Sequence, residues 1–401
     1  MEILSSAKRM AKEMIADRRY LHQNAEVGFT LPKTKAYVEK RLREMGYTPK
    51  PCGRAGLVAE IGDMTKGCFL LRADMDGLPI RERSGESFAC KVGNMHACGH
   101  DMHTAMLLGA AALLQKRAKT LQGGVRLLFQ PAEEQLAGAA DCIEDGVLKG
   151  VYGGMMLHVL PSMPFSVGTA VVSDVEVSAP AADFFDVEIS GKGCHGSSPW
   201  QGVDALLIGT KIVDGAQTFA ARELSPRDYA TLTFGRFSAG AADNVIAARA
   251  TLGGTLRAMS ESTREHLKKR LTEMAQSTAR GLRGRAKVVF KSGCPCLMND
   301  EATAKAVYAI GRQTIGERRA LLASQLPQGG VGGSEDFAYI AQKVPSVMVG
   351  LCAGEGKKGY TEPLHSPRVR FDEGVLPYGA ALLCAAAEGL RGKKRKISDK
   401  I

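Results

Sequence analysis

The chain has 401 residues, of which 45% are hydrophobic and 24% are charged. Such a length predicts two or three domains, and the composition excludes a disordered or fibrous protein. The formal net charge is +11, but much of the basic excess lies in the run RGKKRK at residues 391–396, which we interpret as a solvated tail. The rest of the chain is only mildly basic, and we expect no specific nucleic-acid partner.

The cysteines and the N-terminal residues predict the compartment. The ten cysteines lack the dense, regular spacing of a small secreted scaffold, so we interpret them as reduced thiols. The first twenty residues interleave charged and apolar residues at helical spacing and lack the apolar stretch of a signal peptide. No apolar run approaches the length of a membrane span. We therefore expect a cytoplasmic protein without a membrane partner.

Between residues 69 and 159, short apolar runs alternate with polar clusters and a helical segment. The runs at 69–71, 125–129 and 155–157 predict strands, and the Ala- and Leu-rich segment 103–119 predicts a helix. This alternation favours an α/β fold with a mostly parallel sheet covered by helices. Open α/β sheets bind ligands at the carboxyl ends of their strands, so the polar clusters should share one edge.

The middle third of the chain follows a different pattern, βαββαβ, which is the order of a ferredoxin-like α+β unit. The expected strands are 184–189, 229–237, 248–258 and 286–291, and the expected helices are 203–222 and 262–282, the second opening with a capping box at Ser262. We therefore predict a catalytic domain of residues 1–180 and 293–401, interrupted by an inserted domain of residues 181–292. The last segment should hold a helix from about 302, a strand at 345–351 and an Ala-rich helix at 375–390.

The densest cluster of chemically active residues is NMHACGHDMH at residues 94–103. Cys98 and His100 are two residues apart, so in a loop both side chains can face one point. A thiolate and a neutral imidazole there would bind a divalent ion. Asp101 and His103 would then orient the ligand histidines. The alternative is a polar loop whose histidines only cap neighbouring structure.

Two adjacent carboxylates, Glu133 and Glu134, follow the apolar run at 125–129. One of them could hold a metal ion while its neighbour removes a proton from water. Taken alone, the pair is more typical of a solvated first turn of a helix. His158 and His365 are ambiguous in the same way, because either could be a satisfied core histidine.

Considered together, these candidates exceed what one metal ion needs. A tetrahedral ion that keeps one position open uses three protein ligands. Asp74 and Asp76, in the motif RADMDGLP, leave the first strand at the same edge and could bind metal or orient a ligand. The set predicts a site for two metal ions, with the candidate ligands Cys98, His100, Glu134, His158 and His365.

The inserted segment offers candidates for substrate binding. His195 lies in the glycine-rich sequence 191–196, which is usually only a turn but could place a hydrogen-bond donor near the oxyanion of a tetrahedral intermediate. Asn244 and Arg257 could bind a substrate carboxylate, Arg257 through its bidentate guanidinium. The sequence does not separate this role of Arg257 from a surface salt bridge.

In this order, the motifs resemble the amidohydrolase branch of the aminoacylase and carboxypeptidase metallopeptidases. That branch includes hippurate hydrolase, N-acyl amino acid amidohydrolases and the hydrolases of indole-acetyl-amino acids. The resemblance covers nearly the whole chain and rests on RYLH with EVGF, RADMDGLP, HACGHDMH, FQPAEE, LHVLP, GKGCHGSSP, DNVI, GGSEDFAY and LHSP.

This resemblance implies a catalytic α/β domain with an inserted lid that also forms a homodimer, and two divalent ions, commonly manganese or zinc, on the five ligands named above. It implies that Glu133 is the general base and acid and that Asp76 orients the metal site. His195 would reach an active site, often that of the neighbouring subunit.

The expected activity is metal-dependent hydrolysis of the amide bond of N-acyl amino acids, hippurate-like substrates included. A dipeptidase, a carboxypeptidase or an N-acetyl amino acid deacetylase would use the same residues. A hydrolase with Cys98 as nucleophile and His100 or His103 as base is a further alternative, and it would survive removal of metal. The most distant alternative is a non-catalytic protein that binds nucleic acid with its basic tail.

Overall fold

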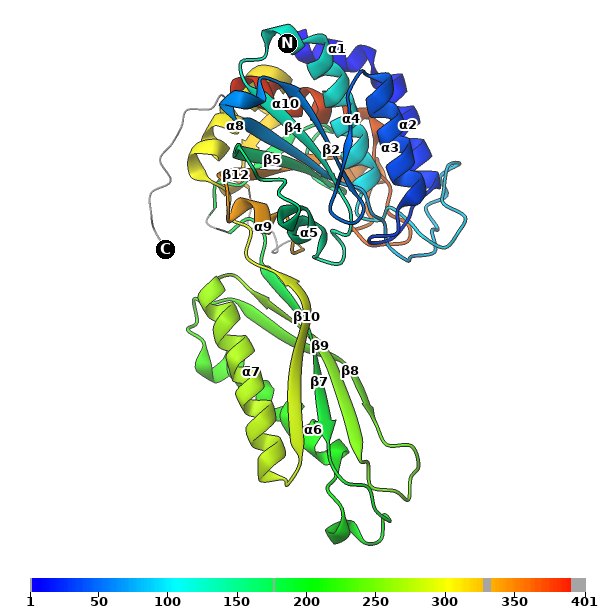
Figure 1. The fold of residues 1–401 in the computed structure, drawn as a ribbon, viewed down its shortest axis with the longest axis vertical. Coiled ribbons are helices and arrows are strands. Elements are labelled where there is room, and N and C mark those ends of the chain that lie inside the picture. Colours follow the sequence, from blue (N-terminus) through cyan, green and yellow to red (C-terminus); the bar gives the residue numbers. More distant parts are fainter. Residues whose placement is uncertain (1, 176, 327–332, 391–401) are drawn as a thin grey trace. The chain divides into compact units, whose positions relative to one another are not determined.

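The computed structural model describes residues 2–175, 177–326 and 333–390. The chain divides into two compact units (Figure 1). Unit 1 comprises the described residues up to Ser178 together with 298–326 and 336–390, and unit 2 comprises Ala179–Leu297 and residues 333–335. The sequence predicts these boundaries after residues 180 and 292. The basic run at 391–396 lies outside the described residues.

Unit 1 is built on an eight-stranded sheet of order β1-β2-β4-β3-β5-β12-β6-β11. Its four central strands are parallel to one another. β3 is buried along its whole length, as expected for a continuous apolar run at the centre of a parallel sheet. The central strands are β4 (Gly124–Gln130), β3 (Cys68–Asp74), β5 (Val151–Leu160) and β12 (Ser346–Cys352).

The outer strands make the sheet mixed rather than mostly parallel, which corrects the prediction. β2 pairs antiparallel with β4, and β1 pairs antiparallel with β2. On the other side, β6 runs antiparallel to β12 and parallel to β11. Three of these four strands have only three residues, too few for a periodic signal in the sequence. They are β1 (Lys50–Cys52), β2 (Gly56–Gly62), β6 (Ala170–Val172) and β11 (Ala320–Leu322).

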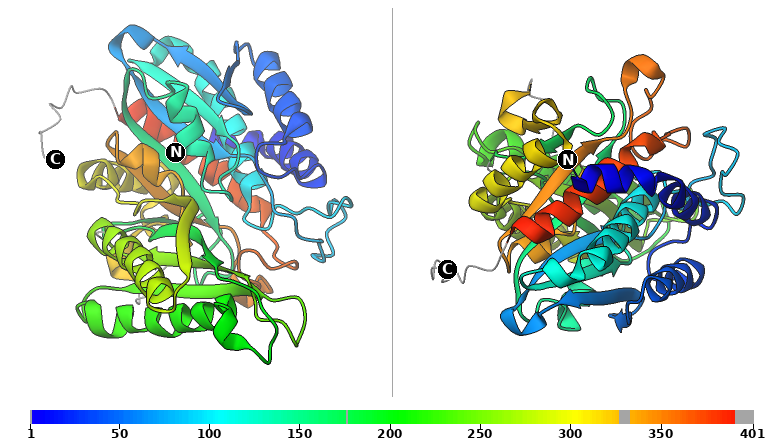
Figure 2. Two further views of the ribbon diagram at one scale, coloured as in Figure 1. Left: turned by 60° about the horizontal axis from the view of Figure 1, so that its bottom comes forward. Right: turned by 90° about the horizontal axis from the view of Figure 1, so that it is seen from above.

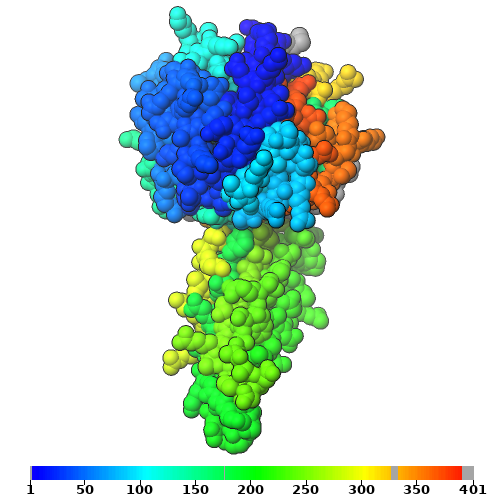
Figure 3. All heavy atoms as spheres, turned by 90° about the vertical axis from the view of Figure 1, so that its right-hand side faces the viewer, coloured from blue at the N-terminus to red at the C-terminus, as the bar shows by residue number. Residues whose placement is uncertain are grey.

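Helices α4 and α10 pack against each other and against the central strands of unit 1, and the right-hand view of Figure 2 shows them side by side. They can approach closely because Gly379 has no side chain. A Cβ atom at this position would lie only 1.9 Å from Sδ of Met106. The N-terminal residues, coloured blue, cover one face of unit 1 (Figure 3). The helices of unit 1 are α1 (Glu2–Arg9), α2 (Ala11–Gln23), α3 (Pro32–Glu44), α4 (His100–Lys116), α5 (Gly138–Glu144), α8 (Glu301–Ile315), α9 (Ala338–Ala341) and α10 (Leu376–Gly389).

Unit 2 is a four-stranded antiparallel sheet of order β10-β7-β9-β8 with two helices. Along the chain the order is β7-α6-β8-β9-α7-β10, a ferredoxin-like arrangement. Apolar residues from the strands and both helices form a core separate from that of unit 1. The elements are β7 (Ala181–Ser190), α6 (Ala205–Ala216), β8 (Ala230–Ala239), β9 (Arg249–Ala258), α7 (Glu261–Gly281) and β10 (Arg285–Cys294).

Several element boundaries differ from those expected. α4 begins at His100 rather than at 103, so His100 and His103 both lie in its first turn. α7 is capped by Ser260, whose side chain accepts a hydrogen bond from the Thr263 amide at 3.1 Å. The predicted capping box at Ser262 is wrong because that residue already lies inside the helix. Among the described residues, no helix combines the length and the apolar character that spanning a bilayer requires.

A buried ion pair in unit 2 allows a test of its packing. Arg264 on α7 donates to Asp183 on β7 at 2.7 and 2.9 Å, and both side chains are largely buried. Arg264→Met leaves Asp183 buried without this partner, so we expect a loss of about 3 kcal/mol in the free energy of unfolding. Denaturant titration followed by circular dichroism measures the change.

Arg270→Met is the matched control on the same helix. Arg270 pairs with Glu223 at 2.6 Å, but both groups are more exposed, so its loss should cost less than about 1 kcal/mol. Equal destabilisation by the two variants would contradict this account of the Asp183 pair.

Candidate metal centre

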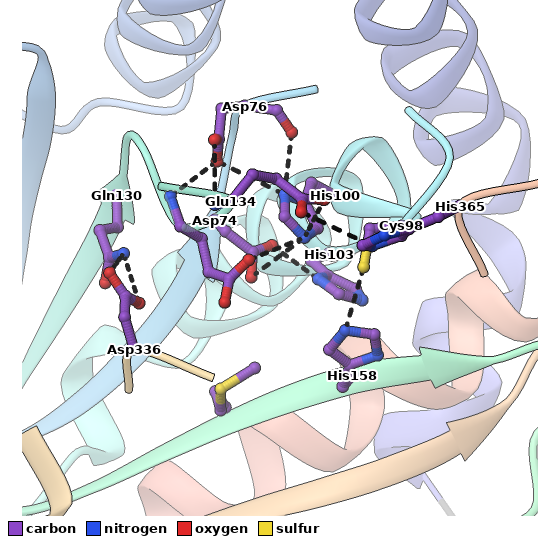
Figure 4. Close-up of polar contacts among 12 residues, drawn as sticks. Asp74, Asp76, Cys98, His100, His103, Gln130, Glu134, His158, Asp336 and His365 are labelled. Carbon is purple, nitrogen blue, oxygen red and sulfur yellow. Dashed lines mark hydrogen bonds and ion pairs between the residues drawn. The ribbon is translucent and has the colours of Figure 1, made fainter. Parts of the chain in front are cut away.

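The candidate residues of unit 1 gather at the carboxyl ends of three central strands and at the start of α4 (Figure 4). Asp74 ends β3, Gln130 ends β4, and His158 lies near the end of β5. Cys98 precedes α4 and His100 opens it. This is the edge of the sheet at which the sequence places the polar clusters.

A glycine sets the path of the chain between Cys98 and His100. Gly99 has φ 85°, and a Cβ atom there would lie 2.3 Å from Cγ2 of Val159. No other residue fits this conformation and this space. The Cys98–His100 turn therefore packs directly against the end of β5.

His365 comes from a distant loop and also has a left-handed backbone, with φ 65°. Its amide donates to the carbonyl of Ala97 at 2.9 Å, which joins this loop to the Cys98–His100 turn. A positive φ at a non-glycine residue is strained and is often found at functional sites. Ala132 and Leu136, on either side of the Glu133–Glu134 pair, are strained in the same way, with φ 53° and 51°.

Backbone carbonyls fix the tautomers of two histidines. Nδ1 of His100 donates to the Asp76 carbonyl at 2.8 Å, and Nδ1 of His158 donates to the Val159 carbonyl at 2.9 Å. Because a carbonyl only accepts, each Nδ1 carries a proton, and Nε2 is the nitrogen that can bind a metal ion when the ring is neutral. Nε2 of His100 is buried without a hydrogen-bond partner among the described residues, and Nε2 of His158 lies 3.5 Å from Sγ of Cys98.

The two glutamates lie across from His100. Its Nε2 is 3.8 Å from Oε2 of Glu133 and 3.8 Å from Oε1 of Glu134. The other oxygen of Glu134 is 3.5 Å from Nε2 of His365. The carboxylate of Asp76 accepts hydrogen bonds from the amides of Glu133 and Glu134 at 3.0 and 3.3 Å. Asp76 therefore holds the backbone of the glutamate pair with its side chain, and His100 with its carbonyl.

The five candidate ligands form two groups of three that share Cys98. In each group the ligand atoms lie within 4.8 Å of one another. One group is Cys98, His100 and His158, and the other is Cys98, Glu134 and His365. A thiol, imidazoles and a carboxylate at this spacing form a donor set that suits borderline divalent ions.

The electrostatics of the cluster also fit a cation. Burial, reinforced by the charge of Glu134, raises the pKa of the Cys98 thiol well above its usual value. Burial likewise raises the pKa of Glu134 to about 7, although His100 opposes the shift. Burial and the nearby His103 lower the pKa of His158 to about 3, which keeps its ring neutral. Acids gathered in such a place need positive charge nearby, which divalent ions supply.

His103 does not orient a ligand histidine as predicted. Its Nδ1 donates to Oδ1 of Asp74 at 2.6 Å, and its Nε2 accepts from the Val159 amide at 2.9 Å. Both ring nitrogens are thus occupied, although Asp74, His100 and His103 lie close enough to suggest a third ligand group. His103 instead fixes the backbone immediately after His158.

Two buried arginines complete the surroundings of the site, and the sequence analysis missed both. Arg72 donates to Asp74 at 2.8 Å, to Asp336 at 2.7 Å and to Gln130 at 2.9 Å. Arg18 donates to Asp101 at 2.8 Å. The predicted role of Asp101 therefore changes, because it anchors the start of α4 to α2 and makes no contact with a ligand ring that the structure describes. An arginine beside an apolar run gives no local signal of such distant partners.

The substrate-binding candidates of unit 2 are brought together only in part. His195 pairs with Val245 in an isolated bridge, and the Gly196 amide donates to the Asn244 carbonyl at 2.7 Å, so His195 and Asn244 lie on adjoining segments. Arg257 lies on β9 with its guanidinium 5.7 Å from the ring centre of Phe184. Within the described residues, no hydrogen bond or ion pair links Arg257 to His195 or Asn244.

The turn at Gly99 generates a test of the site. Gly99→Ala would drive a methyl group into Val159, so we expect the Cys98–His100 turn to shift and bound metal to fall at least about tenfold. Metal content after dialysis, measured by mass spectrometry, gives the result. Gly93→Ala is the control, because Gly93 has φ 90° but nothing within 4 Å of its added Cβ. Equal metal loss in both variants would point to backbone strain and not to the contact with Val159.

His22 links the site to the pH dependence of stability. Its two ring nitrogens contact Asp101 at 2.8 Å and Glu82 at 3.0 Å. Burial lowers the pKa of His22, but the charge of Asp101 and the hydrogen bonds to both carboxylates outweigh burial and raise that pKa to about 9.

Because the folded pKa of His22 lies above its unfolded value of 6.5, its contribution to stability is full below pH 6.5. The contribution is lost as the pH rises through 9, and we expect it to reach about 3 kcal/mol. The free energy of unfolding of the wild type should therefore fall faster between pH 6.5 and 9 than that of His22→Gln. Parallel pH profiles would show that His22 is not held in its charged form.

Comparison with known proteins places the chain in a family. The model of peptidase family M20/M25/M40 matches residues 70–389. An N-acetyl-L-cysteine deacetylase of Bacillus subtilis is 36% identical over 395 residues, with 97% of this chain and 91% of the relative covered. The IAA-amino acid hydrolase ILR1-like 2 of Arabidopsis thaliana is 35% identical over 392 residues, with 96% and 87% covered.

A solved structure supports the same family assignment. The crystal structure of a dinuclear metal-binding peptidase of family M20 from Bacillus subtilis has a TM-score of 0.77 and 31% identity, with 96% of this chain and 100% of that chain covered. The resemblance of the sequence motifs is thus confirmed over nearly the whole chain. The chain belongs to peptidase family M20/M25/M40 and is a hydrolase.

Proposed function

We propose that the protein hydrolyses the amide bond of N-acyl amino acids, hippurate-like substrates included, to a carboxylic acid and a free amino acid. The observation that carries this proposal is the pair of ligand groups sharing Cys98, with Glu133 beside them. Two divalent ions, manganese or zinc, would be held by Cys98, His100, Glu134, His158 and His365. When bound, they would polarise the amide carbonyl and acidify water.

The chain itself supplies the proton transfers. Glu133 takes a proton from the attacking water and later gives it to the leaving amine, so that the amide C–N bond breaks with no net consumption of acid or base. Asp76 positions Glu133 through the hydrogen bond to its amide at 3.0 Å. A buried carboxylate held in this way meets its substrate with little reorganisation.

His195 is suited to donate a hydrogen bond to the oxyanion. Its Nδ1 accepts from the Ser197 amide at 3.2 Å, so a neutral ring carries its proton on Nε2. We propose that this Nε2–H is the oxyanion donor and that Asn244 and Arg257 bind the substrate carboxylate. Arg257 is half-buried, and its guanidinium donates to the Leu256 carbonyl at 3.2 Å and forms no ion pair among the described residues, which supports a role in binding an anion and not in a surface salt bridge.

A second substrate class has direct support. The Bacillus subtilis relative is named for deacetylation of N-acetyl-L-cysteine, so a short acetyl group is an alternative to the aromatic acyl group of hippurate. Dipeptides are the third possibility. The Cys98 nucleophile is disfavoured, because burial raises the pKa of its thiol well above the usual value and so opposes formation of the attacking thiolate.

We further propose that unit 2 is a lid that forms a homodimer, and that the protein is cytoplasmic. β8 is an edge strand, and Leu206, Leu207 and Phe237 on α6 and β8 are exposed, which favours burial of this surface by another copy. The ten free cysteines suit a reducing compartment.

Glu133→Gln tests the proposed base. We expect kcat to fall at least about a thousandfold with metal content unchanged, because the amide cannot accept the proton. Glu144→Gln, an exposed glutamate on the next helix, should retain wild-type turnover and serves as the control. Near-full activity of Glu133→Gln would remove Glu133 from this role.

A substrate panel tests the reaction class. The chelated protein should be inactive, and added manganese or zinc should restore release of free amino acid from benzoyl-glycine or from N-acetyl amino acids. Liquid chromatography of the released amino acid ranks the benzoyl, acetyl and dipeptide substrates. Full activity after chelation would favour a cysteine nucleophile and would contradict the metal-dependent mechanism.

A further inference from the structure

Outside the metal centre, two cysteines from distant parts of unit 1 lie together. Cys52 ends β1, and Cys142 lies on α5. Sγ of Cys52 donates a long hydrogen bond to the Cys142 carbonyl oxygen at 3.9 Å. Sγ of Cys142 also lies 3.3 Å from where a Cβ of Gly56 would stand, and Gly56 is the strand partner of Cys52. We propose that Cys52 and Cys142 form a redox-active dithiol that hydroperoxides oxidise to an intramolecular disulfide.

The chain on both sides of the thiols is held in place. Gly53, next to Cys52, donates its amide to Asp145 at 2.8 Å. Arg54 donates its amide to Asp141, next to Cys142, at 2.8 Å and its side chain to the same carboxylate at 2.9 Å. Three hydrogen bonds thus align the turn after β1 with α5. Such alignment lowers the entropic cost of joining two sulfur atoms that are 90 positions apart.

The two sulfur atoms differ in environment and in access. Cys52 is 3% exposed and lines a cleft of about 420 Å³, which Tyr47, Arg126 and Asp145 also line. The cleft brings a small oxidant close to Cys52, whereas Cys142 is fully buried. The neighbouring Cys142 lowers the pKa of Cys52 against the effect of burial, whereas Cys52 and burial both raise the pKa of Cys142 well above its usual value. A lowered thiol pKa beside a second cysteine is the usual arrangement in redox-sensing pairs.

The reaction balances with a hydroperoxide as the only oxidant. The Cys52 thiolate attacks the terminal peroxide oxygen, the O–O bond breaks, and Cys52 becomes a sulfenic acid while water or an alcohol leaves. The Cys142 sulfur then attacks the Cys52 sulfur, forms the S–S bond and releases water. The two thiols lose two electrons and two protons, and the peroxide gains them. A thiol reductant reverses the change by disulfide exchange.

The test uses the full-length, metal-loaded protein treated with hydrogen peroxide. Remaining thiols are blocked with N-ethylmaleimide under denaturing conditions, and proteolytic peptides are mapped by mass spectrometry. We expect a Cys52–Cys142 cross-linked peptide that a thiol reductant separates. Recovery of Cys52 and Cys142 as separate maleimide adducts, at a dose that oxidises the half-exposed Cys194, would overturn the proposal.

Two variants distinguish the role of Cys52, which attacks the peroxide, from that of Cys142, which closes the disulfide. In Cys142→Ser the cross-link should be absent, and Cys52 should accumulate as a sulfenic acid that dimedone traps. In Cys52→Ser the Cys142 thiol should remain unoxidised. Cys68→Ser is the matched control, because Cys68 is buried, near Arg126 and Glu60, and its pKa is raised by burial. It should form the cross-link at the wild-type rate. A cross-link that persists in Cys142→Ser, or that disappears in Cys68→Ser, contradicts the assignment.

Discussion

The candidate metal centre depends on the pairing of charges that are buried at the end of the central sheet. The guanidinium of Arg72 is fully buried and contacts Asp74, Asp336 and Gln130. Asp74 is thereby held against His103, and His103 holds the amide of Val159. Removal of any one partner would leave another charge or polar group buried without compensation, which costs several kcal/mol. The ends of strands β3, β4 and β5 are therefore fixed relative to one another, and the candidate ligand His158 lies on β5 among them.

A second set of contacts fixes the ligands themselves. Asp76 accepts from the amides of the glutamate pair through its side chain and from His100 through its carbonyl. Gly99 lets the turn between Cys98 and His100 lie against Val159, and His365 is tied to Ala97. Hydrogen bonds hold both strained residues, since the His365 amide donates to Ala97 and the Ala132 carbonyl accepts from the amides of Ala137 and Gly138. The chain itself therefore holds the donor atoms in position, which lowers the free-energy cost of assembling the site when an ion binds.

The sequence predicts those parts of this arrangement that have a local signal. The apolar runs of β3, β4, β5 and β12 are long enough to be recognised, and the density of His and Cys at 94–103 marks the ligand turn. The direction of the outer strands could not be predicted, because β1, β6 and β11 are too short to show periodicity. The partners of Asp101 and Asp336 were missed for a different reason. Arg18 lies 83 positions from Asp101, and Arg72 lies 264 positions from Asp336, so only the folded chain brings them together.

The same contacts give a physical reason for assigning different roles to two adjacent glutamates. Glu134 lies between two histidines, since one oxygen is 3.8 Å from His100 and the other is 3.5 Å from His365. Glu133 lies 3.8 Å from His100 and belongs to neither of the two groups of candidate ligands that share Cys98. A carboxylate that binds metal needs its oxygens aimed at the ion, whereas a base needs an oxygen that faces the attacking water. Because Asp76 holds both amides, the two side chains cannot exchange places without breaking its hydrogen bonds. The proposed division into ligand and base is therefore built into the backbone of the Glu133–Glu134 pair.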